Sequence, residues 1–214
     1  MEKIKMSNPW EAIDLSIYEK HMSSAEVYQL QLLNEITKEQ LMDNEQAYVS
    51  VLGVAGGNGL DNIDISKTKK VYAVDINKNY LDICRERYEF MGEALELLCM
   101  DLTDEDAFLP FTNLLICNLI VEYIGEEKFV ATIERNKNNV EVVSCVIQKN
   151  NNNSFVSNSE HNSHFDPILS IHHDVDEDKL KNLFATIKFN CIKSKEYLLP
   201  NGKKFIRMDF SKAL

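Results

Sequence analysis

Apolar residues recur at helical spacing in the first part of the chain. They are Val27, Leu30, Leu33, Ile36 and Leu41. This spacing predicts helices that turn one apolar face toward a core, and we expect residues 9–45 to be largely helical. Ser23 and Ser24 precede the apolar series, and serine is a common residue at the start of a helix.

From Tyr48 onward the pattern changes to short apolar runs separated by helical stretches. A buried strand is predicted wherever such a run is bounded by turn residues. The strands expected on this basis are 49–52, 70–74, 95–100, one within 113–119, and 140–148, and the helices are 80–91, 126–136 and 176–187. Strands that alternate with helices indicate βαβ units and a parallel sheet.

The end of the chain has a different pattern. Two extended runs, 189–199 and 203–210, flank Pro200-Asn201-Gly202, and Asn-Gly between such runs is a strong hairpin signal. The predicted fold is therefore α/β: a doubly wound, Rossmann-like, seven-stranded sheet, mostly parallel with an antiparallel C-terminal hairpin, plus an N-terminal helical cap. We place the cap at residues 1–46 and the main domain at residues 47–214.

Composition narrows the class of protein. Hydrophobic residues make up 44% and charged residues 27% of the chain, as in ordinary globular proteins. No apolar run reaches the roughly 18 residues of a membrane helix, and residues 1–6 lack the apolar stretch of a secretory signal. The five cysteines include no C-x-x-C pair. These features predict a cytoplasmic protein with reduced thiols and no membrane partner.

The net charge of -11 argues against nucleic acid as a partner, because phosphate backbones would be repelled. One stretch has the opposite sign. Residues 188–212 contain seven lysines and arginines against Glu196 and Asp209. This stretch is either a solvated face of the hairpin or a docking face for an anionic partner.

The first predicted strand runs into Gly53-Val54-Ala55-Gly56-Gly57-Asn58-Gly59. We expect this turn to lead from the strand into a helix, and glycines there let a ligand approach the backbone, whose amides can donate to a carboxylate. The second strand ends in Asp75, placed to accept hydrogen bonds from two ribose hydroxyls. The third ends at Asp101-Leu102, where an acid can meet an adenine amino group. Either acid could instead cap the helix or turn after it.

These three segments resemble the motifs of the class I S-adenosylmethionine-dependent methyltransferases over residues 48–150. The family's first motif aligns with residues 51–59, the second with Val71-Tyr72-Ala73-Val74-Asp75, and the third with Cys99-Met100-Asp101-Leu102. The resemblance implies S-adenosylmethionine as cofactor and S-adenosylhomocysteine as product. It implies a binding site made of Gly53, Ala55, Gly57, Gly59, Asp75, Ile76, Asp101, Leu102 and Asn118.

Relatives in this family often close the cofactor pocket with an N-terminal helical segment that carries an aromatic residue. Trp10, Tyr18, His21, Met22 and Tyr28 are bulky for a surface helix, and we expect Tyr18 to fill that role. The alternative is plain packing of the helix on the sheet.

The chain also departs from the family pattern. Gly53 stands where the family has an acid, Ala55 replaces its first glycine, and residues 136–139 replace the glycine pair before the fifth strand. We therefore expect backbone carbonyls near Gly53 and Ala55, aided by the N-terminal helix, to meet the cofactor's ammonium group. On this view the substitution Gly53→Asp should be tolerated.

A nicotinamide-dependent oxidoreductase is the main alternative enzyme. Its fingerprint requires a glycine three residues after Gly59, and this position holds Asn62. The fingerprint therefore fails. A protein that binds the cofactor as a sensor or partner subunit, without catalysis, is the alternative outside enzymes.

Candidate residues for the chemistry come after the fourth strand, in Asn118-Leu119-Ile120-Val121-Glu122-Tyr123. Glu122 could be a base, bind a cationic group, or simply favour a helix start. The Asn-Pro-Pro-aromatic motif of exocyclic-amine methyltransferases is absent, which argues against adenine or glutamine amides as acceptors.

Four histidines occur later: His161, His164, His172 and His173. Their spacing matches no standard metal site, so no metal is expected. His173 is our second candidate base, because histidine titrates near neutral pH. The function expected is methyl transfer from S-adenosylmethionine, by in-line displacement, to an unidentified small-molecule acceptor.

Overall fold

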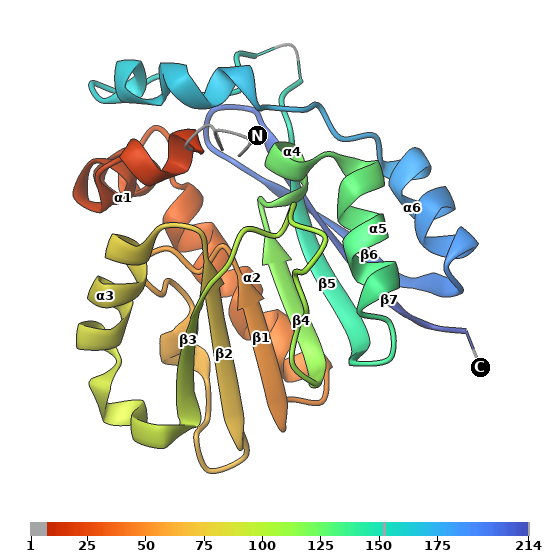
Figure 1. The fold of residues 1–214 in the computed structure, drawn as a ribbon. Helices are drawn as coiled ribbons and strands as arrows, with labels where there is room; N and C mark the ends of the chain where they lie inside the picture. The colour runs from red at the N-terminus through yellow and green to blue at the C-terminus, as the bar shows by residue number, and fades with distance from the viewer. Residues whose placement is uncertain (1–7, 152, 214) are drawn as a thin grey trace, which may run out of the picture.

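The computed structural model describes residues 8–151 and 153–213, and its centre is a seven-stranded sheet (Figure 1). The strand order is β3-β2-β1-β4-β5-β7-β6. The pairs among β1 to β5 are parallel, whereas β7 is antiparallel to both β5 and β6. The fold class predicted from the sequence is confirmed. The strands are β1 (Tyr48–Leu52), β2 (Lys70–Asp75), β3 (Leu95–Cys99), β4 (Thr112–Asn118), β5 (Val140–Lys149), β6 (Phe189–Leu198) and β7 (Lys204–Lys212).

Helices cover both faces of the sheet because the strand side chains alternate in direction. On β4, Leu114 and Ile116 pack in one cluster with residues of α2 and α3, while Leu115 and Cys117 pack with α5 and α6. The α-helices are α1 (Leu15–Ser23), α2 (Gln29–Asp43), α3 (Lys78–Arg87), α4 (Val121–Ile124), α5 (Glu126–Arg135) and α6 (Glu177–Thr186). The 3-10 helices are η1 (Pro9–Ala12), η2 (Leu60–Asn62), η3 (Glu89–Ala94) and η4 (Asn162–Ser170).

The N-terminal helices begin at positions other than the predicted ones. Asp14 caps α1, because its carboxylate accepts the backbone N–H groups of Ser16 and Ile17 at 2.8 and 3.3 Å. Ser24 comes after the end of α1 and does not cap a helix start. Tyr28, with a left-handed φ of 53°, directly precedes α2. The prediction of a serine cap was therefore wrong.

The glycine turn after β1 was expected to lead into a helix. Between β1 and β2 the structure has only η2, a single three-residue 3-10 helix. Helix α2, which comes before β1 in the chain, contacts both η2 and β4. It thereby covers sheet surface near the turn.

The C-terminal hairpin forms as predicted, with Asn201-Gly202 in the turn between β6 and β7. Several of its basic residues pair with acids of α2. Lys193 donates to Asp43 at 2.5 Å, Lys195 to Glu39 at 2.8 Å, and fully buried Arg207 to Asp43 at 2.8 Å. These three of the seven basic residues in the stretch are therefore neutralised within the protein.

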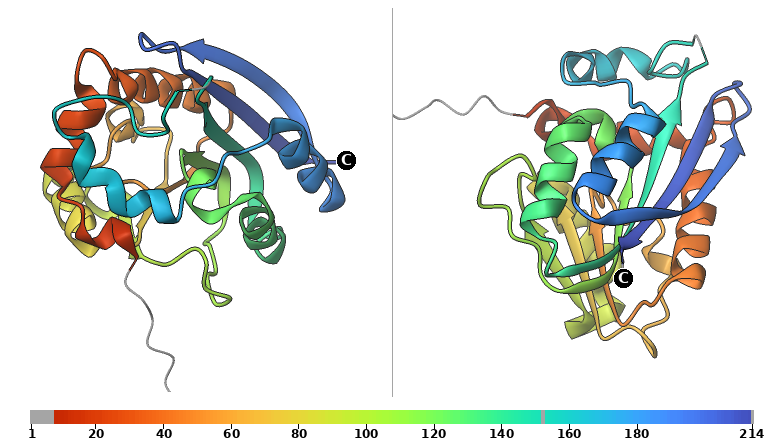
Figure 2. Two further views of the ribbon diagram at one scale, coloured as in Figure 1. Left: turned by 90° about the horizontal axis from the view of Figure 1, so that it is seen from above. Right: turned by 90° about the vertical axis from the view of Figure 1, so that its right-hand side faces the viewer.

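Two segments lie above the carboxyl ends of the parallel strands (Figures 1 and 2). We call them together the lid: residues 8–23, with η1 and α1, and residues 153–171, with η4. Ile13 of the first segment forms a small apolar cluster with Phe165 and Ile168 of the second. Of the predicted cap at residues 1–46, residues 1–7 lie outside the described residues, residues 8–23 belong to the lid, and α2 packs on the sheet. The separate cap domain stays a prediction.

Candidate functional site

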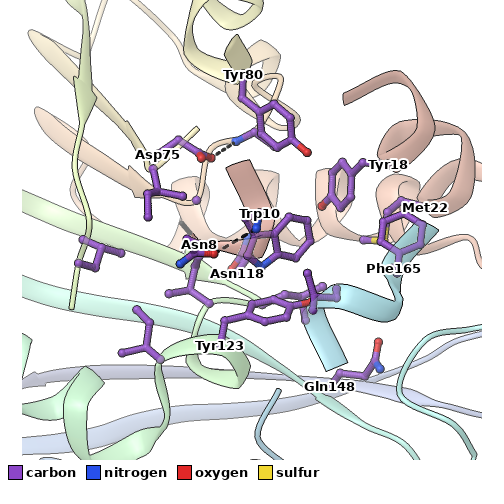
Figure 3. A pocket seen from close by; sticks show the side chains of 18 of the residues that line it. Asn8, Trp10, Tyr18, Met22, Asp75, Tyr80, Asn118, Tyr123, Gln148 and Phe165 are labelled. Carbon is purple, nitrogen blue, oxygen red and sulfur yellow. Dashed lines mark hydrogen bonds between the residues drawn. The ribbon is translucent and has the colours of Figure 1, made fainter. Parts of the chain in front are cut away.

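A cavity lies between the lid and the carboxyl ends of β1, β2 and β4 (Figure 3). It contains about 1160 Å³ of atom-free space, part of it open to solvent. In parallel α/β sheets this edge is the usual ligand site, because the loops that leave the strands converge there. Of the ten predicted cofactor-binding residues, eight line this cavity: Tyr18, Gly53, Ala55, Asp75, Ile76, Asp101, Leu102 and Asn118.

Asp75, the last residue of β2, is the buried acid of the cavity, with 8% of its surface exposed. One carboxylate oxygen accepts the N–H of Ala55 at 2.9 Å, and the other accepts the N–H of Asn77 at 2.9 Å. Burial raises the pKa of Asp75 despite these two backbone hydrogen bonds. Each oxygen keeps a further lone pair for a ligand hydroxyl, so the residue fits the ribose-binding role.

The turn after β1 presents its backbone to the cavity at Gly53 and Ala55. Both residues have left-handed φ values, 67° and 49°, and the N–H of Gly53 is bonded to the carbonyl of Val74 at 2.8 Å. A Cβ atom on Gly53 would lie 2.2 Å from Cδ1 of Ile120. The Ile120 side chain can move, but the positive φ still disfavours any L side chain. The expectation that Gly53→Asp is tolerated is therefore not supported by this geometry.

Gly57 and Gly59 do not line the cavity. An added Cβ would lie 2.3 Å from the ring of Tyr88 at Gly57 and 2.7 Å from Thr37 at Gly59. Both glycines therefore allow close packing of the turn against neighbouring side chains. Their predicted role in binding the cofactor stays a prediction, and this packing is a sufficient reason for both residues.

Asp101 comes after β3 and lines the cavity together with Leu102 and Thr103. Its Oδ1 accepts the N–H and the hydroxyl of Thr103, at 2.9 and 2.7 Å. Asp101 therefore shapes its own turn, as the capping alternative predicted, and also lines the cavity. Its contact with the adenine amino group stays a prediction.

Asn118, the last residue of β4, is held by α2. It exchanges two hydrogen bonds with Gln40, at 2.9 and 3.0 Å, and donates to Thr37 at 3.2 Å. Gln40 is fully buried. This part of the cavity wall therefore has a fixed orientation before any ligand binds.

The two candidate bases, Glu122 and His173, do not line the cavity. Glu122 is 1% exposed, and its Oε1 accepts the N–H of Gln148 at 2.6 Å. Its Oε2 has no partner among the described residues, and burial raises its pKa to about 7. His173 is exposed, and its backbone N–H donates to the Glu122 carbonyl at 2.6 Å. Their catalytic role stays a prediction.

Aromatic side chains from the lid and from α4 surround the remaining space (Figure 3). The Trp10 ring lies edge-to-face with Tyr18 and Tyr123, at centroid distances of 5.7 and 4.9 Å. Phe155 and Phe165 line the same end. Trp10 and Tyr18 are unusually bulky for a surface helix and could be singled out in the sequence, whereas the two phenylalanines were missed. Apolar residues within the polar stretch 150–176 were the available signal.

The acidic and histidine side chains that the structure describes do not gather into a metal cluster. Within residues 8–151 and 153–213, no group of three or more His, Cys, Asp or Glu side chains is arranged to hold a metal ion. None of the described helices combines the length and apolar character required to span a membrane.

No protein-family model and no curated protein sequence matches the chain. Solved structures match its fold. The magnesium protoporphyrin IX methyltransferase (ChlM) from Synechocystis PCC 6803, with bound SAM, superposes with a TM-score of 0.68 over 99% of this chain and 100% of that chain, at 8% identity. An S-adenosylmethionine-dependent methyltransferase from Clostridium acetobutylicum ATCC 824 superposes with a TM-score of 0.63 over 93% of this chain and 97% of that chain, at 14% identity.

The cyclase SpnF also matches, with a TM-score of 0.63 over 86% of this chain and 81% of that chain, at 6% identity. At such identities the likeness establishes the fold and not the reaction. The structural neighbours named here include both methyltransferases and a cyclase. The chain has the fold of the class I S-adenosylmethionine-dependent methyltransferases.

Proposed function

We propose that the chain binds S-adenosylmethionine and transfers its methyl group to a small-molecule acceptor. The observation that carries this proposal is the division of one cavity into two ends. One end has a buried carboxylate and a backbone turn that lines the cavity, and the other has uncharged aromatic walls.

The residues present fit the cofactor. Asp75 would accept the ribose hydroxyls, Ile76 and Leu102 would pack against the adenine, and the backbone at Gly53 and Ala55 would meet the methionine part. When bound, the cofactor supplies an electrophilic methyl group on a positively charged sulfur. Proximity and alignment supply most of the catalysis for such a displacement, and the fixed Asn118 wall and the lid supply both.

An acceptor that carries a proton on its nucleophilic atom would also need a base to remove it, and neither candidate base lines the cavity. Glu122 contacts the backbone of Gln148, a cavity-lining residue, and precedes the cavity-lining Tyr123. In this proposal Glu122 is a positioning residue that acts through Gln148. An acceptor that needs no strong base suits the site best.

A second candidate function is cofactor binding without methyl transfer, as a sensor or partner subunit. The location of Glu122 and His173 away from the cavity wall favours it, as does a cyclase among the proteins with this fold. Both candidates predict cofactor binding, and only the first predicts a methylated product.

Titration calorimetry with S-adenosylhomocysteine tests the shared part. We expect binding, and a ligand at a hundredfold excess over its dissociation constant should stabilise the fold by about 2.7 kcal/mol. Incubation of a small-molecule extract with the protein and methyl-labelled S-adenosylmethionine tests the transfer. Label in a new small molecule supports the enzyme; binding without label supports the sensor. Stabilisation by NAD and not by S-adenosylhomocysteine would contradict both.

A further inference from the structure

The lid end of the cavity contains almost no charge. Among the described residues that line the cavity, the carboxylates are Asp75 and Asp101, and both belong to strand ends at the cofactor side. No lysine or arginine of the described chain lines it. His21 lines the lid end, but burial lowers its pKa to about 4, so it is neutral at physiological pH.

One buried lysine, Lys203, contacts residues of the cavity wall without lining the cavity itself. Lys203 is 2% exposed, and its ammonium donates to the Phe155 carbonyl at 2.6 Å and to the Ser157 hydroxyl at 2.9 Å. No carboxylate pairs with it among the described residues. Its positive charge is therefore unfavourable for a cationic ligand, while the absence of a lysine or arginine from the described cavity wall leaves an anionic ligand without a direct partner.

Hydrogen bonds connect Lys203 to two glutamines that line the cavity. Gln148 donates to the same Phe155 carbonyl at 3.0 Å, and its Oε1 accepts from Gln29 at 2.6 Å. Gln29 and Gln148 are both buried, and both line the cavity. We call this series of hydrogen-bonded groups the polar strip: Gln29, Gln148, the Phe155 carbonyl, Lys203 and Ser157.

Each end of the polar strip has one unused hydrogen-bonding group. Ser157 Oγ accepts from Lys203 and also from Asn201, at 3.0 Å, so its own proton remains to be donated. Gln29 Oε1 has no partner within the described part of the chain. The strip therefore offers one donor and one acceptor beside walls of aromatic rings.

The geometry points to a methyl acceptor that is an uncharged, flat ring compound carrying both a hydrogen-bond acceptor, for Ser157, and a donor, for Gln29. The rings of Trp10, Tyr123, Phe155 and Phe165 provide the apolar contact area for its faces and edges. This inference rests on the proposed function, because it assigns the second ligand of the same cavity.

Three probes of nearly equal shape isolate the charge: 2-naphthamide is neutral, 2-naphthoate is an anion and 2-naphthamidine is a cation. Each is titrated by calorimetry into the full chain after saturation with S-adenosylhomocysteine. We expect 2-naphthamide to bind at least tenfold more tightly than either charged probe. Equal or tighter binding of a charged probe, or no binding of any of the three, would overturn the inference.

A matched pair of serine variants tests the polar strip. Ser157→Ala removes the donor, and we expect it to weaken 2-naphthamide about tenfold while leaving S-adenosylhomocysteine affinity unchanged. Ser170→Ala, an exposed change in the same lid segment, should alter neither. An unchanged affinity in folded Ser157→Ala would overturn the role of the strip, and the charge series on the natural protein remains decisive if that variant unfolds. Failure to bind S-adenosylhomocysteine would instead refute the proposed function.

Discussion

The two ends of the cavity are built in different ways. The cofactor end consists of strand termini, where Asp75 and Gly53 are fixed by backbone hydrogen bonds within the sheet and its turns. The lid end consists of segments outside the sheet, 8–23 and 153–171, whose rings contact one another. Under the proposed function, the sheet would determine which cofactor fits, and the lid would determine which molecule receives the methyl group.

The largest expected effect is at Asp75. Asp75→Ala removes a buried carboxylate that we assign to the ribose hydroxyls, and S-adenosylhomocysteine affinity in calorimetry should fall about a hundredfold. Asp101 is the matched acid after the next strand, and one of its oxygens already binds Thr103. Asp101→Ala should therefore lower S-adenosylhomocysteine affinity by less than about tenfold. Equal S-adenosylhomocysteine affinities of Asp75→Ala and the natural chain would contradict the assignment of Asp75 to the ribose hydroxyls.

A second prediction concerns Glu122, whose folded pKa of about 7 lies above its ordinary value of 4.5. Between these values the folded state binds the proton more tightly, so this group's stabilising contribution is complete below pH 4.5 and is lost as the pH rises through 7. From about pH 5.5 to about pH 8.5 the natural chain should lose roughly 2 kcal/mol more unfolding free energy than Glu122→Gln. Urea denaturation of both proteins at both pH values measures this difference in unfolding free energy. Equal losses of unfolding free energy in the two proteins would exclude the raised pKa of Glu122.

Trp10 tests whether the two ends act separately. Trp10→Ala removes the ring between Tyr18 and Tyr123, and we expect 2-naphthamide affinity to fall about tenfold. S-adenosylhomocysteine affinity should change by less than about threefold. Phe90→Ala, which removes a ring that is 67% exposed and outside the cavity, is the control. A larger loss for the cofactor product than for the probe would show that Trp10 belongs to the cofactor end.

The smallest effect separates backbone strain from contact at the glycine turn. Gly53 and Gly202 both have positive φ, 67° and 80°, but of these two only Gly53 has another group, Ile120, close to an added Cβ. Gly202→Ala should destabilise the fold by about 1 kcal/mol, and Gly53→Ala by up to about 1 kcal/mol more. Thermal denaturation measures both, and equal losses would show that Ile120 moves aside at no cost.

The sequence predicted the cofactor end better than the lid end for a physical reason. Strands have a period of two and end at turn residues, so Asp75 could be assigned to a strand end from its neighbours alone. Gly57 and Gly59 were ambiguous, because glycine serves ligand approach and close packing equally well. The helix expected after the turn is replaced by η2, which shows that a glycine-rich turn does not determine the type of element after it.

The lid depends on contacts between distant residues, which local patterns do not reveal. Gln29 and Gln148 are 119 positions apart, and Lys203 reaches Phe155 across 48 positions. Nothing near Lys203 in the sequence distinguishes it from the partly exposed Lys204, since both come directly after the same hairpin turn. Only the folded chain shows that one of these lysines is buried behind the cavity wall.

The position of β7 between β5 and β6 has a consequence for how the chain is made. Residues 189–198 leave the ribosome before residues 204–212, yet β6 pairs only with β7 among the described strands. Until β7 has been synthesised, β6 has no strand to join, and β5 has an unpaired edge. A premature stop within β7 would therefore remove an interior strand, detach its neighbour, and leave the nascent protein open to aggregation along β5.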